Sequence, residues 1–221
     1  MTAKIRISMI VNWLIIIAAA VGLGMMLFAR GGAGAAGAAA VSKVSIWDTG
    51  FGSLKYFSVL ANMLAIVASV RYFTSLTRAL SGKSDQITQR AHVFKYISAC
   101  TLGLCLLSGL LYLSPRLGFE NVMQGPRLWL DIVTPLLALG EFIFLDHGRK
   151  LPVKQTFLAM IPAVVYGIFY IIFSLATGRD WYGFYQLGVP MGILTMAISA
   201  VISWGIAIGV RFANEIMRKR I

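Results

Sequence analysis

A hydroxyl, an amide and a carboxylate lie in two apolar segments of this sequence, and together they could carry out acyl-transfer chemistry. Ser58 and Asn62 are four residues apart, and Asp131 lies in a later apolar segment. Residues four apart share one face of a helix, so Ser58 and Asn62 are expected to point the same way. A serine hydroxyl becomes a nucleophile when a neighbouring base accepts its proton. The residue types therefore predict Ser58 as a nucleophile, Asp131 as its base or orienting group, and Asn62 as a nearby hydrogen-bond donor.

Four further polar side chains are placed to bind a substrate beside that pair. Lys55 lies one helical turn before the candidate nucleophile, and Thr134 lies one turn after the candidate base. Tyr166 and Tyr170 are four residues apart in another apolar segment, and buried tyrosine hydroxyls need hydrogen-bond partners. We predict that these four residues, with Asn62, form the substrate-binding part of the site.

Each of these groups also has a structural interpretation. Ser58 and Asn62 can hydrogen-bond neighbouring helices, as such residues commonly do in membranes. Lys55 can form an ion pair with Asp131, because both lie near the outer ends of their segments. Glu141 lies near the inner end, where an acid either snorkels, is capped or faces the interior of the bundle.

Small and aromatic residues in the other segments suggest packing and interfacial positions. Ser108, Thr195 and Ser199 lie on faces rich in small residues, which allow close approach of helices. The aromatic stretch 181–185 is typical of a membrane interface, or alternatively of a lid over an outward cavity.

The sequence predicts neither a metal site nor a bound cofactor. Its two cysteines, Cys100 and Cys105, both lie inside an apolar segment and form no Cys-x-x-Cys motif. Two histidines complete the set of conventional soft ligands, which is too small and too scattered for a zinc-type site. We expect the cysteines to be reduced and buried.

The composition requires a membrane protein. Of 221 residues, 58% are hydrophobic and 13% charged, and the mean hydropathy is +0.79. The apolar residues form runs of about 20, the length that crosses hydrocarbon as a helix. These runs predict one all-α membrane domain with six transmembrane helices at about 8–29, 51–76, 93–113, 127–145, 156–176 and 187–212. The Gly/Ala-rich segment 31–40 is expected to be an external linker, the alternative being a signal peptide cleaved near Ala40.

Basic residues outside the runs predict the topology. The formal net charge is +12, and counting along the chain places fourteen of the 20 Lys and Arg residues on one side of the membrane and six on the other. Lys95 is included among the fourteen as a loop residue. The positive-inside rule then places both termini in the cytoplasm, with a bacterial inner membrane as the expected location. No basic stripe with interleaved aromatic residues is present, so a nucleic-acid partner is not expected.

Several segments of the chain resemble a known family in the same order along the sequence. The matching stretches are 56–62 (Tyr-Phe-Ser-Val-Leu-Ala-Asn), 129–139, Pro162 to Tyr166, and 181–185 (Trp-Tyr-Gly-Phe-Tyr). They are similar to small bacterial six-helix membrane proteins related to the androgen-induced gene product family of animals. The resemblance covers residues 50 to 215 loosely and implies a six-helix fold.

The resemblance also implies an activity, because the animal members hydrolyse fatty-acid esters of hydroxy fatty acids with an intramembrane threonine and histidine. Ser58 stands at the position of the threonine and Asp131 at that of the histidine. Serine supplies the same hydroxyl. Aspartate has an ordinary pKa of about 3.9 against about 6.5 for histidine, so it is the weaker base at neutral pH.

These observations predict an integral membrane protein with an outward-facing polar cavity that binds a lipid or small amphiphile. Intramembrane hydrolysis of lipid esters is the first alternative, and a small transporter is the second. Whether the protein is an enzyme, and its oligomeric state, stay open at this point. Membrane lipids are the expected partners.

Overall fold

The computed structural model describes residues 2–28, 50–82, 87–146, 148, 150–185 and 188–220. Within these ranges the chain has no β-strand, and six helices are long and apolar enough to cross a membrane. They are Ala3–Phe28, Phe57–Leu80, Gln89–Leu117, Gly125–Leu145, Val153–Thr177 and Val189–Lys219. The predicted all-α bundle with six spans is confirmed, and the chain is a multi-pass membrane protein.

Several spans are built from more than one helical segment. The first three contain α1 (Thr2–Phe28), α3 (Phe57–Leu80) after the 3-10 helix η1 (Gly50–Lys55), and α4 (Gln89–Ser108), η2 (Gly109–Leu113) and α5 (Ser114–Leu117). After α6 (Phe119–Val122), the fourth span contains α7 (Gly125–Arg127), η3 (Leu128–Val133), α8 (Thr134–Gly140) and η4 (Glu141–Leu145). The last two contain η5 (Val153–Met160) with α9 (Ile161–Thr177), and α10 (Val189–Arg220).

The helix ends differ from those predicted from the apolar runs. Helix α1 begins at Thr2 rather than at 8, and α10 continues to Arg220 rather than ending at 212. Hydropathy marks only the stretch that suits hydrocarbon, whereas the helical hydrogen bonds continue into the polar region. Tyr56 is extended (φ −80°, ψ 136°), so α3 begins at Phe57 rather than at 51. Residues 29, 31–40 and 187, which the predicted spans and linker included, lie outside the described residues.

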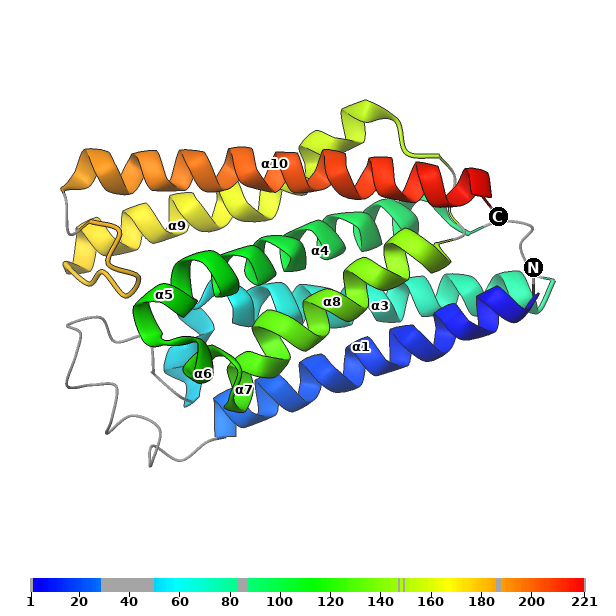
Figure 1. Cartoon of the computed structure of the whole chain (residues 1–221), viewed down its shortest axis with the longest axis horizontal. Coiled ribbons are helices and arrows are strands. Elements are labelled where there is room, and N and C mark those ends of the chain that lie inside the picture. The colour runs from blue at the N-terminus through cyan, green and yellow to red at the C-terminus, as the bar shows by residue number, and fades with distance from the viewer. Residues whose placement is uncertain are drawn as a thin grey trace.

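The long helices run side by side along the molecule (Figure 1). Helix α1 packs on α3, α3 on α4 and α4 on α8, while α10 packs on both α4 and α9. Both termini lie at one end of the bundle, which we call the basic end. The short helices α5, α6 and α7 lie at the opposite end (Figure 1).

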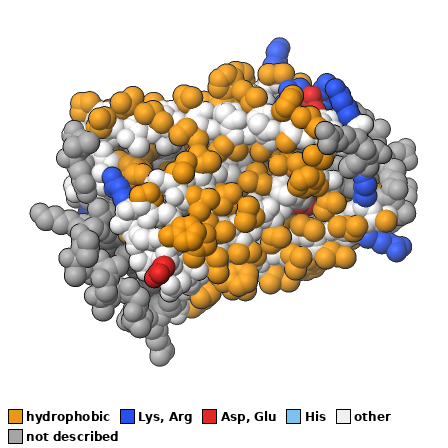
Figure 2. Space-filling model, viewed as in Figure 1, with side chains coloured by type: hydrophobic (Ala, Val, Ile, Leu, Met, Phe, Trp, Pro, Cys, Tyr) orange, Lys and Arg blue, Asp and Glu red, His pale blue; other side chains and the backbone are white. Residues whose placement is uncertain are grey.

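The surface has the polarity of a membrane protein. Figure 2 shows hydrophobic side chains over the middle of the visible face, with basic side chains gathered toward the basic end. Large apolar residues such as Ile17, Val67, Ile172 and Val201 are more than half exposed. A monomer in water rarely exposes apolar area on this scale, whereas a lipid-facing surface requires it.

Three π-helical segments interrupt the third and fourth spans, and two of them flank α8. Segment η3 carries Asp131 and η4 begins with Glu141. Pro135, in the first turn of α8, has no N–H to donate to the turn before it. Wide π turns occur often at functional sites.

Candidate functional site

Asp131 is the centre of a buried polar cluster at the end of the bundle opposite the termini. Its side chain is only 2% exposed, although it lies within a membrane-spanning segment. Ser58, on α3, lies beside the Asp131 carboxylate. Arg127, one turn earlier on the same span, places Nη1 3.4 Å from Asp131 Oδ2. The structure thus brings together the two residues predicted as nucleophile and base, and adds a guanidinium that the sequence analysis had not included.

The ion-pair partner of the Asp131 carboxylate is therefore Arg127, where the structural interpretation had expected Lys55. The Lys55 ammonium lies over two aromatic rings, 5.3 Å from the ring centre of Tyr56 and 5.7 Å from that of Trp181. These distances are typical of cation–π contacts. Lys55 accordingly stands beside the aromatic cluster described below.

Asn62 supports the backbone of the π-helical segment. Its Nδ2 donates to the carbonyl of Ser58 at 2.8 Å and to that of Leu130 at 2.9 Å. In a π-helix the partner of the Leu130 carbonyl would be the N–H of residue 135, which is a proline and has none. The Asn62 amide supplies the missing donor across the helix interface. Both of its amide hydrogens are therefore already engaged within the protein.

Tyr166 and Tyr170 hold the loop that follows α9. The Tyr166 hydroxyl donates to the Lys55 carbonyl at 2.7 Å and lies 3.2 Å from Nε1 of Trp181, which donates to it. The Tyr170 hydroxyl hydrogen-bonds the Asp180 carboxylate. Their hydroxyls are thus engaged in fixing the loop, although the side chain of Tyr166 also contributes to a cavity wall.

The Asp180 carboxylate organises the same loop from within. It accepts hydrogen bonds from the backbone N–H groups of Gly183, Phe184 and Tyr185, at 2.8, 3.1 and 2.7 Å. Tyr182 lies between this turn and the bundle, where its hydroxyl accepts the N–H of Phe57 at 3.0 Å. Burial raises the pKa of Tyr182 well above its ordinary value, so the hydroxyl stays neutral. The aromatic stretch 181–185 therefore packs as a fixed cover at this end of the bundle.

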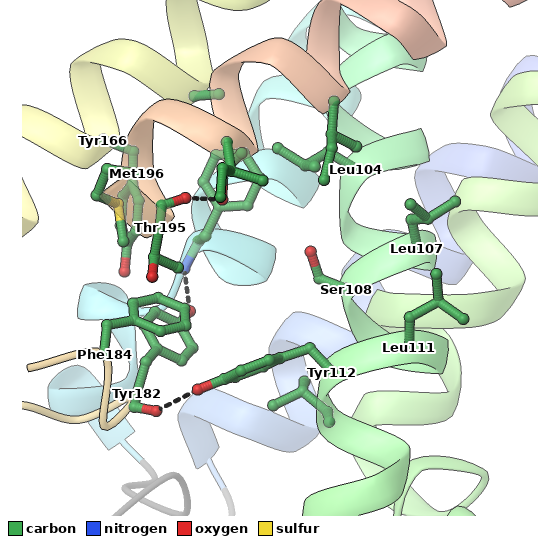
Figure 3. A pocket seen from close by; sticks show the side chains of 16 residues that line it. Leu104, Leu107, Ser108, Leu111, Tyr112, Tyr166, Tyr182, Phe184, Thr195 and Met196 are labelled. Carbon is green, nitrogen blue, oxygen red and sulfur yellow. Dashed lines mark hydrogen bonds between the residues drawn. The ribbon is translucent and has the colours of Figure 1, made fainter. Parts of the chain in front are cut away.

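A cavity of about 300 Å³ lies below this cover, between α4, α9 and α10 (Figure 3). Most of its wall is apolar and includes Leu104, Leu107, Leu111, Met196, Ile198 and Ile202. Ser108, at the end of α4, and Tyr112, in η2, face it (Figure 3). A volume of this size is at the lower limit for small-molecule sites, which occupy about 300–1,000 Å³.

Two hydroxyl groups in the cavity wall come from faces that the sequence analysis assigned to helix packing. Thr195 and Ser199 line the cavity, but Thr195 Oγ1 donates to the Met191 carbonyl and Ser199 Oγ to the Thr195 carbonyl, each at 2.8 Å. A hydroxyl that donates to a carbonyl of its own helix has no hydrogen left to donate to a ligand in the cavity. This cavity is therefore mainly apolar, whereas the sequence analysis predicted a polar one.

The cavity and the Ser58–Asp131 pair are neighbours, but neither member of the pair lines the cavity. Phe57 and Ser108, which do line it, are adjacent in sequence to Ser58 and Gly109. A Cβ placed on Gly109 would lie 3.2 Å from Asp131 Cβ, so glycine allows the two spans to approach closely here. Residues next in the chain to Ser58 and to Gly109 thus belong to the cavity wall.

Thr134 is the first residue of α8, directly after the π-helical segment η3, and it is buried. Its Oγ1 has no hydrogen-bond partner among the described residues. Thr134 does not contribute to the cavity wall, so the structure places it outside the space where a ligand would lie.

Lys95 is the residue that the sequence analysis misplaced. It was counted as a loop charge, but it lies inside α4 with 2% of its surface exposed. Its ammonium is 3.7 Å from the carboxylate of Glu141, which is itself 1% exposed. The sequence does contain a signal for this pair, because Lys95 and Glu141 lie at similar depth from the same membrane face. Among the described residues, no cluster of three or more His, Cys, Asp or Glu side chains could hold a metal.

The chain matches no protein-family model, no curated protein and no solved structure. The resemblance to relatives of the androgen-induced gene product family therefore stays a prediction. What the fold defines is the class, a multi-pass membrane protein with six helices and two buried polar clusters inside its spans.

Proposed function

We propose that this protein binds the acyl chain of a membrane lipid or small amphiphile in the cavity between α4, α9 and α10. The observation that carries the proposal is a cavity of about 300 Å³ with a mainly apolar wall inside the membrane-spanning region. Its lining residues Leu111 and Ile198 are 70% and 49% exposed, as expected for a cavity that is open at the surface of the bundle. In this proposal the opening faces lipid, and an acyl chain enters from the bilayer.

The location of the protein follows from the charge distribution. We propose a bacterial inner membrane with both termini in the cytoplasm, because the positive-inside rule places the basic end there. The cavity then lies nearer the outer face of that membrane.

Filling the cavity tests the binding proposal. Ala163 lines it, whereas Val165 on the same helix is 59% exposed and points away from it. The purified protein should crosslink a photoreactive fatty acid, and Ala163→Phe should lower that labelling at least tenfold. Val165→Phe should label like the wild type. Equal labelling of all three proteins would show that the probe binds elsewhere.

Lipid-ester hydrolysis is the second candidate, favoured by the position of Ser58 beside the Asp131 carboxylate. A serine that a neighbouring base activates reacts with a fluorophosphonate probe, which forms a bond to Oγ and releases fluoride. Labelling of the wild type that disappears in Ser58→Ala but persists in Ser108→Ala would establish the nucleophile. An unlabelled wild-type protein would leave the pair with a structural role.

A further inference from the structure

A second polar cluster lies inside the basic half of the bundle, apart from the cavity. Five buried side chains from four spans meet there, namely Ser8 and Asn12 of α1, Ser69 of α3, Lys95 of α4 and Glu141 of η4. Glu141 Oε1 accepts from Ser8 Oγ at 2.6 Å and from Asn12 Nδ2 at 3.0 Å. The cluster lies within the membrane-spanning helices, since Glu141 is four residues before the end of its span and Asn12 is nine residues after the start of its own.

The two charged groups of this cluster are held by different partners. Lys95 Nζ donates to Asn12 Oδ1 at 2.7 Å and to Ser69 Oγ at 2.9 Å. Its distance to Glu141 Oε2 is 3.7 Å, beyond the usual range for an N–H···O hydrogen bond of about 2.7–3.2 Å. Glu141 Oε2 has no other hydrogen-bond partner among the described residues. One carboxylate oxygen is therefore buried beside a cation without a hydrogen bond.

Such an arrangement is costly if its only task is to hold helices together. Burying an ion pair removes two charges from water, and apolar residues of similar size often stabilise a fold as well or better. Ionisable residues within membrane spans therefore commonly serve ion or proton pathways. The unbonded Oε2 of Glu141 is the atom at which a proton can be added.

A chain of side chains leads from this cluster to the basic end, and its first step is a cation–π contact. Lys95 Nζ lies 6.0 Å from the ring centre of Tyr72, and the hydroxyl of Tyr72 donates to Asp146 Oδ1 at 2.9 Å. Asp146 also bonds His92 Nε2 at 2.9 Å and forms an ion pair with Arg218.

That chain ends at a second cavity. Lys4, Asp146 and Arg218 contribute to the wall of a cavity of about 160 Å³ at the surface of this end. The Asp146 side chain is itself buried, whereas that of Arg218, its ion-pair partner, is 27% exposed.

Apolar side chains separate this cluster from the one around Asp131. The buried residues between them include Ile15, Leu102, Cys105 and Ala138. The polar side chains that lead away from Glu141 are those on the side of the basic end.

We propose that Glu141 is a proton-binding site inside the membrane, which exchanges protons with the solution at the basic end by way of Lys95, Tyr72 and Asp146. Uptake adds one proton to Oε2 and turns the carboxylate into a carboxylic acid, while Lys95 remains an ammonium. Release returns the proton by the same route, and no bond between heavy atoms changes. Lys95 is the charged side chain that faces Glu141 in this cluster, and the groups of α1 and α3 that line it, Ser8, Asn12 and Ser69, are neutral. Helix α10 contributes Asn214, whose amide donates to the Phe142 carbonyl.

Infrared difference spectroscopy of the protein in lipid vesicles tests this proposal. As the pH is lowered over the range in which the protein stays folded, a carboxylic-acid C=O band that shifts in D₂O should appear. The band should be lost in Glu141→Gln and kept in the control Asp131→Asn, which removes the other buried acid. A wild-type protein that shows no band lost in Glu141→Gln, at any pH where it stays folded, would overturn the proposal.

Two further measurements keep the test decisive if Glu141→Gln does not fold. Ser8→Ala removes one donor to the Glu141 carboxylate, so the acid band should appear at a higher pH than in the wild type. In vesicles of known orientation, a pH jump on the side of the basic end should change the band and a jump on the other side should not. An unchanged band in Ser8→Ala, or a response to the opposite side alone, would show that the proposed site or its route is wrong.

Discussion

Asn62 and Pro135 act on the same carbonyl from two different spans. The proline removes the donor that a π-helix would offer to Leu130, and the Asn62 amide donates to it at 2.9 Å. Asn62→Ala leaves this carbonyl without a partner, and an unsatisfied buried polar group costs about 1–3 kcal/mol. We expect a loss of that size in the free energy of unfolding, measured by denaturation in detergent. Asn121→Ala, which removes an exposed amide hydrogen bond to Leu117, should have little effect.

A double-mutant cycle separates this explanation from a general loss of packing. Pro135→Ala restores an N–H at the position that faces the Leu130 carbonyl, so Asn62→Ala should be less destabilising in that background. Equal costs in both backgrounds would mean that the hydrogen bond to Leu130 is not what Asn62 contributes.

Asp146 gives the basic end a dependence on pH. Burial alone would raise the pKa of Asp146, but hydrogen bonds from His92 and the Gly148 N–H, with the charges of His92 and Arg218, lower the pKa from 3.8 to about 2. A lowered pKa stabilises the fold above the unfolded value, so this contribution is present above about pH 4 and is lost as the pH falls toward 2. A shift of nearly two units corresponds to about 2–3 kcal/mol.

Thermal unfolding in detergent measures this contribution. The melting temperature of the wild type should fall between pH 4 and pH 2 more steeply than that of Asp146→Asn. Glu215→Gln, which removes an acid that is 22% exposed and paired with Arg211, should keep the wild-type slope. Parallel slopes for wild type and Asp146→Asn would contradict the prediction.

Residue types in the sequence indicated the Ser58–Asp131 contact but not the Lys95–Glu141 pair. Ser58 and Asp131 lie near the same end of their spans, so depth alone brings them together once the helices pack. Lys95 was interpreted as a loop charge, because a basic residue near the end of an apolar run usually marks topology. The Lys95 ammonium donates to Asn12 and Ser69, which lie in other spans, so no local sequence pattern reveals these contacts.

At the scale of elements, the loop after α9 is fixed by one tyrosine and one aspartate. Tyr170→Phe removes the hydroxyl that orients Asp180, whose carboxylate holds the backbone N–H groups of residues 183–185. Hydrogen exchange of these amides, followed by mass spectrometry, should become faster. Tyr96→Phe is the matched control, since that hydroxyl donates to the Ala207 carbonyl in the other half of the bundle. Exchange at 183–185 that is the same in Tyr170→Phe as in the wild type would show that the loop is held by other contacts.

The six spans could be predicted from the sequence, whereas the winding inside them could not. The thickness of the hydrocarbon core of the bilayer sets the length of each apolar run, and this constraint acts on each segment separately. The π-helical turns depend on which partner takes each freed carbonyl, as Asn62 does for Leu130. That partner comes from another span, so the turn is decided by packing.

For the whole molecule, the membrane orientation is the prediction with the widest consequence. In a background with Cys100→Ala and Cys105→Ala, single cysteines at Arg179 and Lys150 mark opposite ends of the bundle. An impermeant maleimide should label Arg179→Cys in intact spheroplasts and Lys150→Cys only after permeabilisation. The reverse pattern would place the basic end outside and move the proposed proton route to the other face.

The opening of the larger cavity toward lipid has a consequence for how occupancy should be described. A guest that arrives from the bilayer is governed by its mole fraction among the surrounding lipids, and its amount in the aqueous buffer matters little. Adding detergent at a constant total amount of guest lowers the mole fraction of the guest among the amphiphiles. The apparent affinity should therefore fall as the amount of micelles increases. Titrations of different guests are therefore comparable only at one fixed ratio of amphiphile to protein.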